Sequence, residues 1–295
     1  MPLQFVNLFD LNISTFIRYV VYVGLLSAIL PSCELINPAE EIPAYLQIDD
    51  VALSVSEGQG SGSHKITDVW IDAENAVQGV YEMPATFPLL NNGPTYLLIS
   101  AGIMDNGISS TRVAYPLYFP DTMTMDLEEK KIYQLTPQFS YRSATKFSFI
   151  EDFEAGNLFG QIAGDSSLIR VNEEELVFEG GYSAYIYLDP DHPVYEGRTA
   201  NAYEIENGSP VYLELNYKCD QAFEVGLYGT SGFGNISLYK WNINPKETWN
   251  KIYLNMGADV QDLDSDVIQV QIRAVFNGSN TSSHIYLDNI KLVNF

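Results

Sequence analysis

The strongest constraint on the fold of this chain is an alternation of apolar and polar residues with a period of two. In segment 211–218 every second residue is apolar, which gives the set Val211, Leu213, Leu215 and Tyr217. The opposite set is Tyr212, Glu214, Asn216 and Lys218. Because successive side chains of a strand point to opposite faces, the segment predicts a strand with one face in a core and the other in water.

The same alternation recurs in segments 223–227, 252–256 and 268–276, and no window of comparable length has the period of a helix. The chain is therefore predicted to be all-β. Residues 146–295 fit a jelly-roll sandwich, which hides most strand edges by packing sheet on sheet. Residues 45–141 carry shorter runs about 8–12 residues apart with turn signals between them, which predict a smaller antiparallel sandwich.

The first residues contain one uninterrupted apolar run, from Tyr19 to Leu30, with Arg18 before it. A run of about 10–14 residues is too short to span a bilayer and is typical of the apolar region of a signal peptide. The four residues that end it, Leu30-Pro31-Ser32-Cys33, resemble a lipobox, in which the cysteine is acylated and becomes the new N-terminus. The alternatives are an ordinary signal peptide cut near Ser32 and an uncleaved N-terminal anchor.

Under the lipobox interpretation, residues 1–32 are a lipoprotein signal peptide, Cys33 is the lipidated residue, and residues 33–44 form a flexible tether. Stable attachment to a membrane follows from several acyl chains together. The predicted location is the cell envelope, at the outer membrane, with the periplasmic and surface faces both left open.

The charge of the chain argues against some partners. With 38 acidic and 15 basic residues the formal net charge is −23, so nucleic acid and anionic lipid headgroups are repelled. The two cysteines, Cys33 and Cys219, allow no disulfide framework, and Cys219 is interpreted as a structural thiol.

Sequence motifs of enzymes are missing. The chain has no nucleophile elbow, P-loop, His-Glu-x-x-His motif or dinucleotide fingerprint. The acidic runs at 173–175 and 262–266 are interpreted as solvated charge, the second as a loop or helical turn. We therefore predict a protein without enzymatic activity.

Three fragments of residues 146–295 carry a family resemblance: Glu151-Asp152-Phe153-Glu154, Gly180-Gly181-Tyr182-Ser183 and Tyr286-Leu287-Asp288-Asn289-Ile290. Together they look like the carbohydrate-binding-module and galactose-binding-like jelly rolls. In those families the Phe-Glu pair of the first strand and the aspartate of the closing strand hold a structural Ca²⁺ ion. The resemblance implies that Glu154 and Asp288 are side-chain ligands and that Asp152 offers its carbonyl oxygen.

In the closing strand the alternation of apolar and polar residues changes at Asp288. Ile285 and Leu287 have one parity, whereas Ile290 and Leu292 have the other. A β-bulge at Asp288-Asn289 would let both pairs face the core, so a bulge is predicted there. The alternative is that Asp288-Asn289 is a polar break and Glu154 a solvated carboxylate.

Residues 45–141 resemble the PEGA-like and immunoglobulin-like modules of bacterial surface proteins, through Gly79, the segment 83–89 and Asn92-Gly93. A lipobox, a small sandwich and a jelly roll in this order look like uncharacterised lipoproteins of Bacteroidetes. The resemblance implies a module displayed in the cell envelope.

Two aromatic residues are candidates for ligand contact. Tyr239 and Trp241 have the same parity in segment 234–241 and would project from the outer face as a platform. The alternative is that one or both close the edge of the core. The leading hypothesis is a membrane-tethered envelope lipoprotein that binds a glycan or a protein partner. A structural accessory subunit of an outer-membrane assembly is the second hypothesis, and a hydrolase is the third.

Overall fold

The computed structural model describes residues 16–22, 40–206, 208–232, 234–265 and 267–295. The chain divides into two compact units, residues 1–43 and residues 44–295. Residues 16–22 are helical, and in the described part of the chain no helix is long and apolar enough to cross a membrane. Cys33 and the predicted cleavage site lie outside the described residues.

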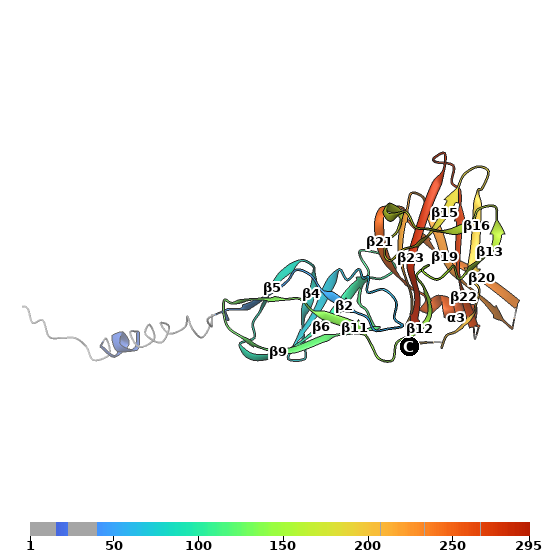
Figure 1. The fold of residues 1–295 in the computed structure, drawn as a ribbon. Coiled ribbons are helices and arrows are strands. Elements are labelled where there is room, and N and C mark those ends of the chain that lie inside the picture. Colours follow the sequence, from blue (N-terminus) through green and yellow to red (C-terminus); the bar gives the residue numbers. More distant parts are fainter. Residues whose placement is uncertain (1–15, 23–39, 207, 233, 266) are drawn as a thin grey trace, which may run out of the picture. The chain divides into compact units, whose positions relative to one another are not determined.

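The unit 44–295 consists mainly of β-strands, which confirms the all-β prediction (Figure 1). The strands of its first half, residues 44–141, are β1 (Ala44–Ile48), β2 (Ala52–Ser54), β3 (Asp68–Ala73), β4 (Ala76–Glu82), β5 (Ala85–Leu89), β6 (Gly93–Met104), β7 (Arg112–Ala114), β8 (Tyr118–Phe119), β9 (Asp121–Leu127), β10 (Ile132–Leu135) and β11 (Gln138–Tyr141).

The second half, residues 146–295, contains β12 (Lys146–Glu151), β13 (Phe159–Gly164), β14 (Leu168–Val171), β15 (Ser183–Leu188), β16 (Val194–Thr199), β17 (Tyr203–Glu204), β18 (Val211–Cys219), β19 (Phe223–Ser231), β20 (Gly234–Ile243), β21 (Lys246–Asn255), β22 (Val267–Val275) and β23 (Ser283–Asn294). Two short helices accompany them, η1 (Glu174–Leu176) and α3 (Gly257–Leu263). The end of α3 falls in the acidic run 262–266, where a loop or helical turn was predicted.

The first half forms three small sheets around one apolar cluster. Their orders are β10-β1-β5, β2-β11-β8 and β4-β3-β6-β7, the last with β9 also paired to β6. Most pairs are antiparallel as predicted, but β1 pairs with β10 and β2 with β11 in parallel. The expectation of a purely antiparallel first sandwich is therefore wrong. A parallel pair needs a long connection between its strands, and these two partners lie far apart in the sequence.

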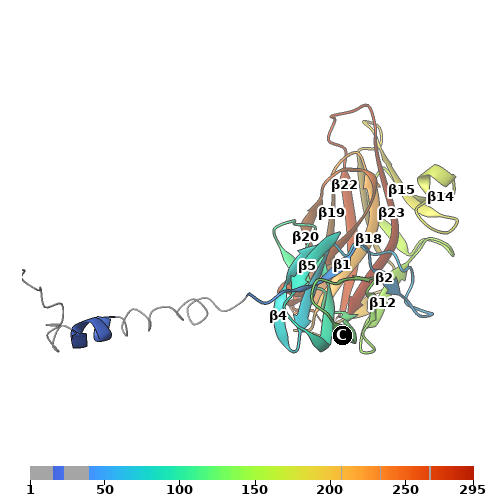
Figure 2. The ribbon, with the colours of Figure 1, turned by 90° about the vertical axis from the view of Figure 1, so that its left-hand side faces the viewer.

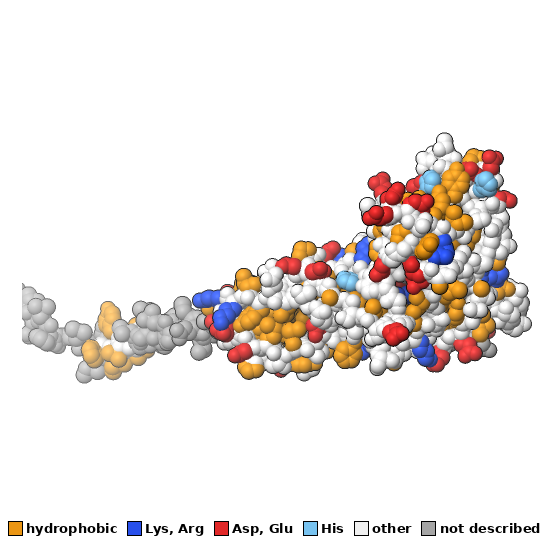
Figure 3. Space-filling model, viewed as in Figure 1, with side chains coloured by type: hydrophobic (Ala, Val, Ile, Leu, Met, Phe, Trp, Pro, Cys, Tyr) orange, Lys and Arg blue, Asp and Glu red, His pale blue; other side chains and the backbone are white. Residues whose placement is uncertain are grey.

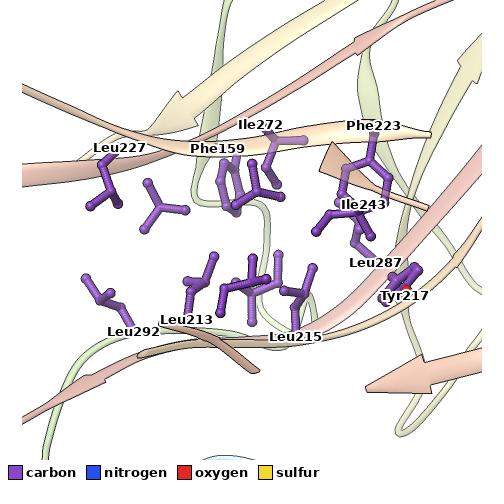
Figure 4. Packing of buried hydrophobic residues seen from close by; sticks show 14 of the residues in the cluster. Phe159, Leu213, Leu215, Tyr217, Phe223, Leu227, Ile243, Ile272, Leu287 and Leu292 are labelled. Carbon is purple, nitrogen blue, oxygen red and sulfur yellow. The ribbon is translucent and has the colours of Figure 1, made fainter. Parts of the chain in front are cut away.

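The second half is a sandwich of two six-stranded sheets. The β18 sheet has the order β14-β15-β23-β18-β21, with β12 on β23. The β19 sheet has the order β13-β16-β22-β19-β20, with β17 on β22. Figure 4 shows the core between them, in which Leu213, Leu215 and Leu292 face Leu227 and Ile272. All strand pairs of this half are antiparallel.

The predicted bulge in β23 is confirmed. Opposite β18, Lys291 aligns with Glu214 and Asp288 with Asn216, so β23 holds one more residue than β18 in this interval. Asn289 has a left-handed backbone with a φ of 47°. As a result Ile285, Leu287, Ile290 and Leu292 are all buried in the same core.

The polar face of β18 is not in water, which corrects the sequence prediction. Tyr212, Glu214 and Asn216 are 4%, 0% and 2% exposed. They are buried because the first half covers this part of the β18 sheet: Tyr212, Tyr253 and Val293 belong to the apolar cluster of the first half. Strands β18 and β23, which carry this covered face, lie side by side (Figure 2).

Candidate functional site

The outer face of the β19 sheet, which the first half does not cover, carries a row of charged side chains. Glu196, Arg273 and Glu224 are direct partners across β16, β22 and β19. The Nε atom of Arg273 donates to a carboxylate oxygen of Glu224 at 2.6 Å, and the two side chains are 36% and 32% exposed. The row is therefore fixed by its own ion pair and open to solvent.

Tyr239 of β20 lies beside this row. Its hydroxyl donates to Glu196 at 2.7 Å, and the guanidinium carbon of Arg273 is 4.3 Å from the centre of its ring. Burial of the ring, together with its hydrogen bond to Glu196, raises the pKa of the phenol. The residue is thus a neutral hydrogen-bond donor with its ring held against a cation.

A second pair of the same kind lies on the same sheet. The guanidinium carbon of Arg198 is 3.7 Å from the ring centre of Tyr228. Both residues border a shallow depression of about 320 Å³, whose other lining residues are Gly160, Gln161, Ile162, Thr199, Ala200 and Gln269. This outer face, with its two arginine–tyrosine pairs and the two carboxylates Glu196 and Glu224, is called the polar face below.

The predicted platform of Tyr239 and Trp241 is not formed. The pairing of β20 with β19 shifts between Val225 and Gly226, so Tyr239 aligns with Gly226 and Trp241 with the buried Val225. Tyr239 therefore lies on the outer face, while Trp241 packs against the core and donates from Nε1 to Asp259 at 2.7 Å. Trp241 thus follows the alternative interpretation of the sequence, in which one of the two aromatic residues closes the edge of the core.

The uncovered part of the β18 sheet carries an aromatic cluster that sequence reasoning did not single out. Tyr185 stacks on Tyr286 at 4.9 Å with 17° between the planes, and it lies parallel to His284 at 5.9 Å. Hydrophobic side chains and histidine gather over β15 and β23 in Figure 3. These ring contacts across neighbouring strands stabilise the pairing of β15 with β23.

The carboxylates predicted as calcium ligands meet at one turn, residues 179–183. Glu154 accepts hydrogen bonds from the backbone N–H groups of Gly181 and Tyr182 at 2.8 and 3.0 Å. Asp288 accepts a bond from the Ser183 hydroxyl at 2.6 Å and one from its neighbour's backbone at 2.7 Å. Both carboxylates thus bind donors of the protein itself.

Asp152, the third predicted ligand, is also hydrogen-bonded within the protein. A carboxylate oxygen of Asp152 accepts from the backbone N–H of Glu154 at 3.1 Å. Among the described residues, no group of three or more His, Cys, Asp or Glu side chains is placed to hold a metal ion. Burial raises the pKa of Asp288 to about 7, as expected for a carboxyl group without a cationic partner. Calcium binding by Glu154, Asp288 and Asp152 stays a prediction.

Comparison with known proteins gives structural matches only. No protein-family model and no curated protein matches the chain. A family 11 carbohydrate-binding module of the cellulosomal cellulase Lic26A-Cel5E of Clostridium thermocellum matches with 14% identity and a TM-score of 0.36, over 52% of this chain and 96% of its own. A carbohydrate-binding module from the β-sandwich superfamily matches with 16% identity and a TM-score of 0.37, over 86% of this chain and 99% of its own.

An enzyme domain is also among the matches. The enzymatically active domain of tailspike protein 4 from bacteriophage CBA120 has 12% identity and a TM-score of 0.38, over 56% of this chain and 26% of its own. At these identities and scores the matches do not identify a function, so a functional proposal has to rest on the residues of this chain.

Proposed function

We propose that this protein is a non-enzymatic module that binds a glycan on the polar face. The observation that carries the proposal is the pair of arginine–tyrosine stacks, Arg273 on Tyr239 and Arg198 on Tyr228, beside two carboxylates. Guanidinium groups donate, carboxylates accept, and sugar hydroxyls do both, so one open face presents both kinds of partner. The tyrosine rings add apolar area next to these groups.

The same contacts argue against hydrolysis. A glycosidase uses two carboxyl groups that flank the scissile bond from opposite sides. On the polar face Glu196 is bonded to Tyr239 and Glu224 to Arg273, and both lie along one row of an open sheet. This arrangement holds hydroxyl groups and offers no enclosed pair of carboxylates.

The proposal includes the location. We propose that acylation of Cys33 attaches the protein to the membrane of the cell envelope, with the acidic sandwiches outside the lipid. Mass spectrometry of the mature N-terminus is the test. An acylated Cys33 supports the proposal, and a retained Met1 or an unmodified Cys33 overturns it.

A glycan array with the purified full chain tests the binding proposal. We expect binding of at least one glycan, and we expect Tyr228→Ala and Tyr239→Ala each to weaken it about 30-fold, as for the truncation of a tyrosine anchor. Tyr187→Ala is the matched control, because this tyrosine is 37% exposed on the outer face of the opposite sheet. Failure of every array, or equal losses in the control, would remove the polar face as a binding site. A partner found only by cross-linking in membranes would favour an accessory subunit instead.

A further inference from the structure

A cavity lies away from the polar face, between the two halves of residues 44–295. It has a volume of about 430 Å³ and opens beside the edge strands β20 and β21. Residues of the first half complete its wall, among them Lys65, Asn106 and Ser109. A volume in the range of about 300–1,000 Å³ is typical of sites for small ligands.

The charge of this cavity is opposite to that of the chain. Its lining includes Lys65, Lys246 and Lys251 and no aspartate or glutamate, although acidic residues outnumber basic ones by 38 to 15. Lys251 is neutralised by Glu214, with 3.0 Å between Nζ and the carboxylate oxygen. Neither Lys65 nor Lys246 forms an ion pair with any carboxylate of the described residues.

The charge of Lys246 acts on Lys65. Desolvation and the charge of Lys246 both lower the pKa of Lys65. The ammonium group of Lys65 donates to the side-chain oxygen of Asn250, a neutral partner that leaves its charge uncompensated. Two like charges near each other repel, and an anion between them would relieve the repulsion.

The rest of the lining is suited to a sugar ring. Trp241 forms part of the wall, and its bond to Asp259 fixes the indole in place. Asn242, Asn244 and Asn250 also line the cavity, and the amide oxygen of Asn250 binds Lys65. A fixed aromatic ring among asparagine residues can provide both apolar contact and hydrogen bonds.

We propose that this cavity binds an anionic saccharide residue, with its carboxylate or sulfate group between Lys65 and Lys246 and its ring against Trp241. The site is separate from the polar face and does not depend on it. It assigns a ligand-binding role to Trp241 different from the predicted platform.

Calorimetric titration of the full chain tests the proposal. The probes are an oligogalacturonide for the carboxylate, a sulfated oligosaccharide for the sulfate, and a neutral oligosaccharide of the same length. We expect at least one acidic probe to bind more tightly than the neutral one, with an affinity that falls as salt is added. The double variant Lys65→Ala/Lys246→Ala is expected to weaken that binding about tenfold or more, because charge-assisted hydrogen bonds are lost.

Three further variants separate the explanations. Lys65→Arg/Lys246→Arg keeps both charges and should retain most of the binding. Lys130→Ala/Lys131→Ala removes the same charge outside the cavity and should have no effect. Tyr228→Ala/Tyr239→Ala should leave the acidic probe bound, so that a failure of the polar face and a failure of this cavity give different results. The proposal is overturned if neither acidic probe binds at millimolar concentration, or if the double alanine variant binds as tightly as the unchanged protein.

Discussion

Asp288 shows how the surroundings of one side chain determine its chemistry. The residue has no exposed surface, and its carboxyl group is bonded to Ser183 and to the backbone of Asn289. Burial outweighs these hydrogen bonds and raises the pKa to about 7. The folded protein therefore holds a proton on Asp288 at a pH where the unfolded chain has already released it.

The sign of the resulting pH dependence follows from this difference. Between about pH 4 and pH 7 the folded state binds one proton more than the unfolded state, so Asp288 makes stability fall as the pH rises, by up to about 1.4 kcal/mol per pH unit. We expect Asp288→Asn to remove this contribution and to raise the stability relative to the unchanged protein at pH 8. Urea unfolding at pH 5 and pH 8 measures both quantities, with Asp152→Asn as the exposed control.

A Ca²⁺ ion bound at this turn would change the expected stability at pH 8. An ion at Glu154 and Asp288 would keep the carboxylate ionised, and a chelator would then lower the melting temperature at pH 8. Equal melting temperatures with and without chelator, at matched ionic strength, would exclude both residues as ligands. A stability of Asp288→Asn below that of the unchanged protein at pH 8 would contradict the pH argument.

At the scale of elements, period-two patterns predicted the strands well. Strand β18 and the bulge of β23 are confirmed because their core residues have strict parity, which only a bulge can change. The core face of β22 was also visible in the sequence, and its opposite face, Gln269, Gln271 and Arg273, followed from the same alternation. The stacking of Arg273 on Tyr239 did not follow, because it depends on which strands are neighbours.

In strand β20 the alternation of side chains gave a wrong prediction, namely that Tyr239 and Trp241 share one face. The register shift opposite Gly226 separates Tyr239 from Trp241, and nothing within β20 signals it. The signal lies in β19: a Cβ atom at Gly226 would be 1.8 Å from the carbonyl oxygen of Leu238, so β19, the strand opposite the bulge, requires glycine at this position.

This requirement gives a prediction for Gly226→Ala. The added methyl group cannot be accommodated unless the backbone of β20 moves, so we expect a loss of about 1–3 kcal/mol in the free energy of unfolding. Glycan binding should weaken as well, because Tyr239 would be displaced from Arg273. Gly156→Ala is the control, since its new Cβ would meet no atom within 4 Å. Equal stabilities of the two variants, measured by urea unfolding, would show that the close approach of Gly226 to the backbone of Leu238 does not limit the stability of the fold.

In the whole molecule, a buried charge cluster joins the two halves of residues 44–295. Glu214 of β18 is 0% exposed and accepts hydrogen bonds from the hydroxyls of Tyr115 and Tyr141, at 2.8 and 3.0 Å, both from the first half. Burial alone would raise the pKa of Glu214, but the charges of Lys251 and Lys291 outweigh burial and lower it. The alternation of β18 could be predicted from the sequence, but this cluster could not. A strand has the same period-two pattern whether its polar face lies in water or is covered by another part of the chain.

Because this cluster links the two halves, we expect them to unfold together. Glu214→Gln keeps the shape of the side chain but removes the counter-charge of the buried Lys251, and breaking a buried ion pair in this way costs about 3–5 kcal/mol. Because the partners of Glu214 come from both halves, we expect the melting of both halves to shift together. Calorimetry gives the overall midpoint, and limited proteolysis with mass spectrometry reports each half separately.

The control is Glu206→Gln, which removes an exposed ion pair with Lys146 and should change stability by less than about 1 kcal/mol. A midpoint shift no larger than that of the control, or a shift confined to one half, would mean that the halves are held together by apolar contacts and not by the charges of Glu214, Lys251 and Lys291.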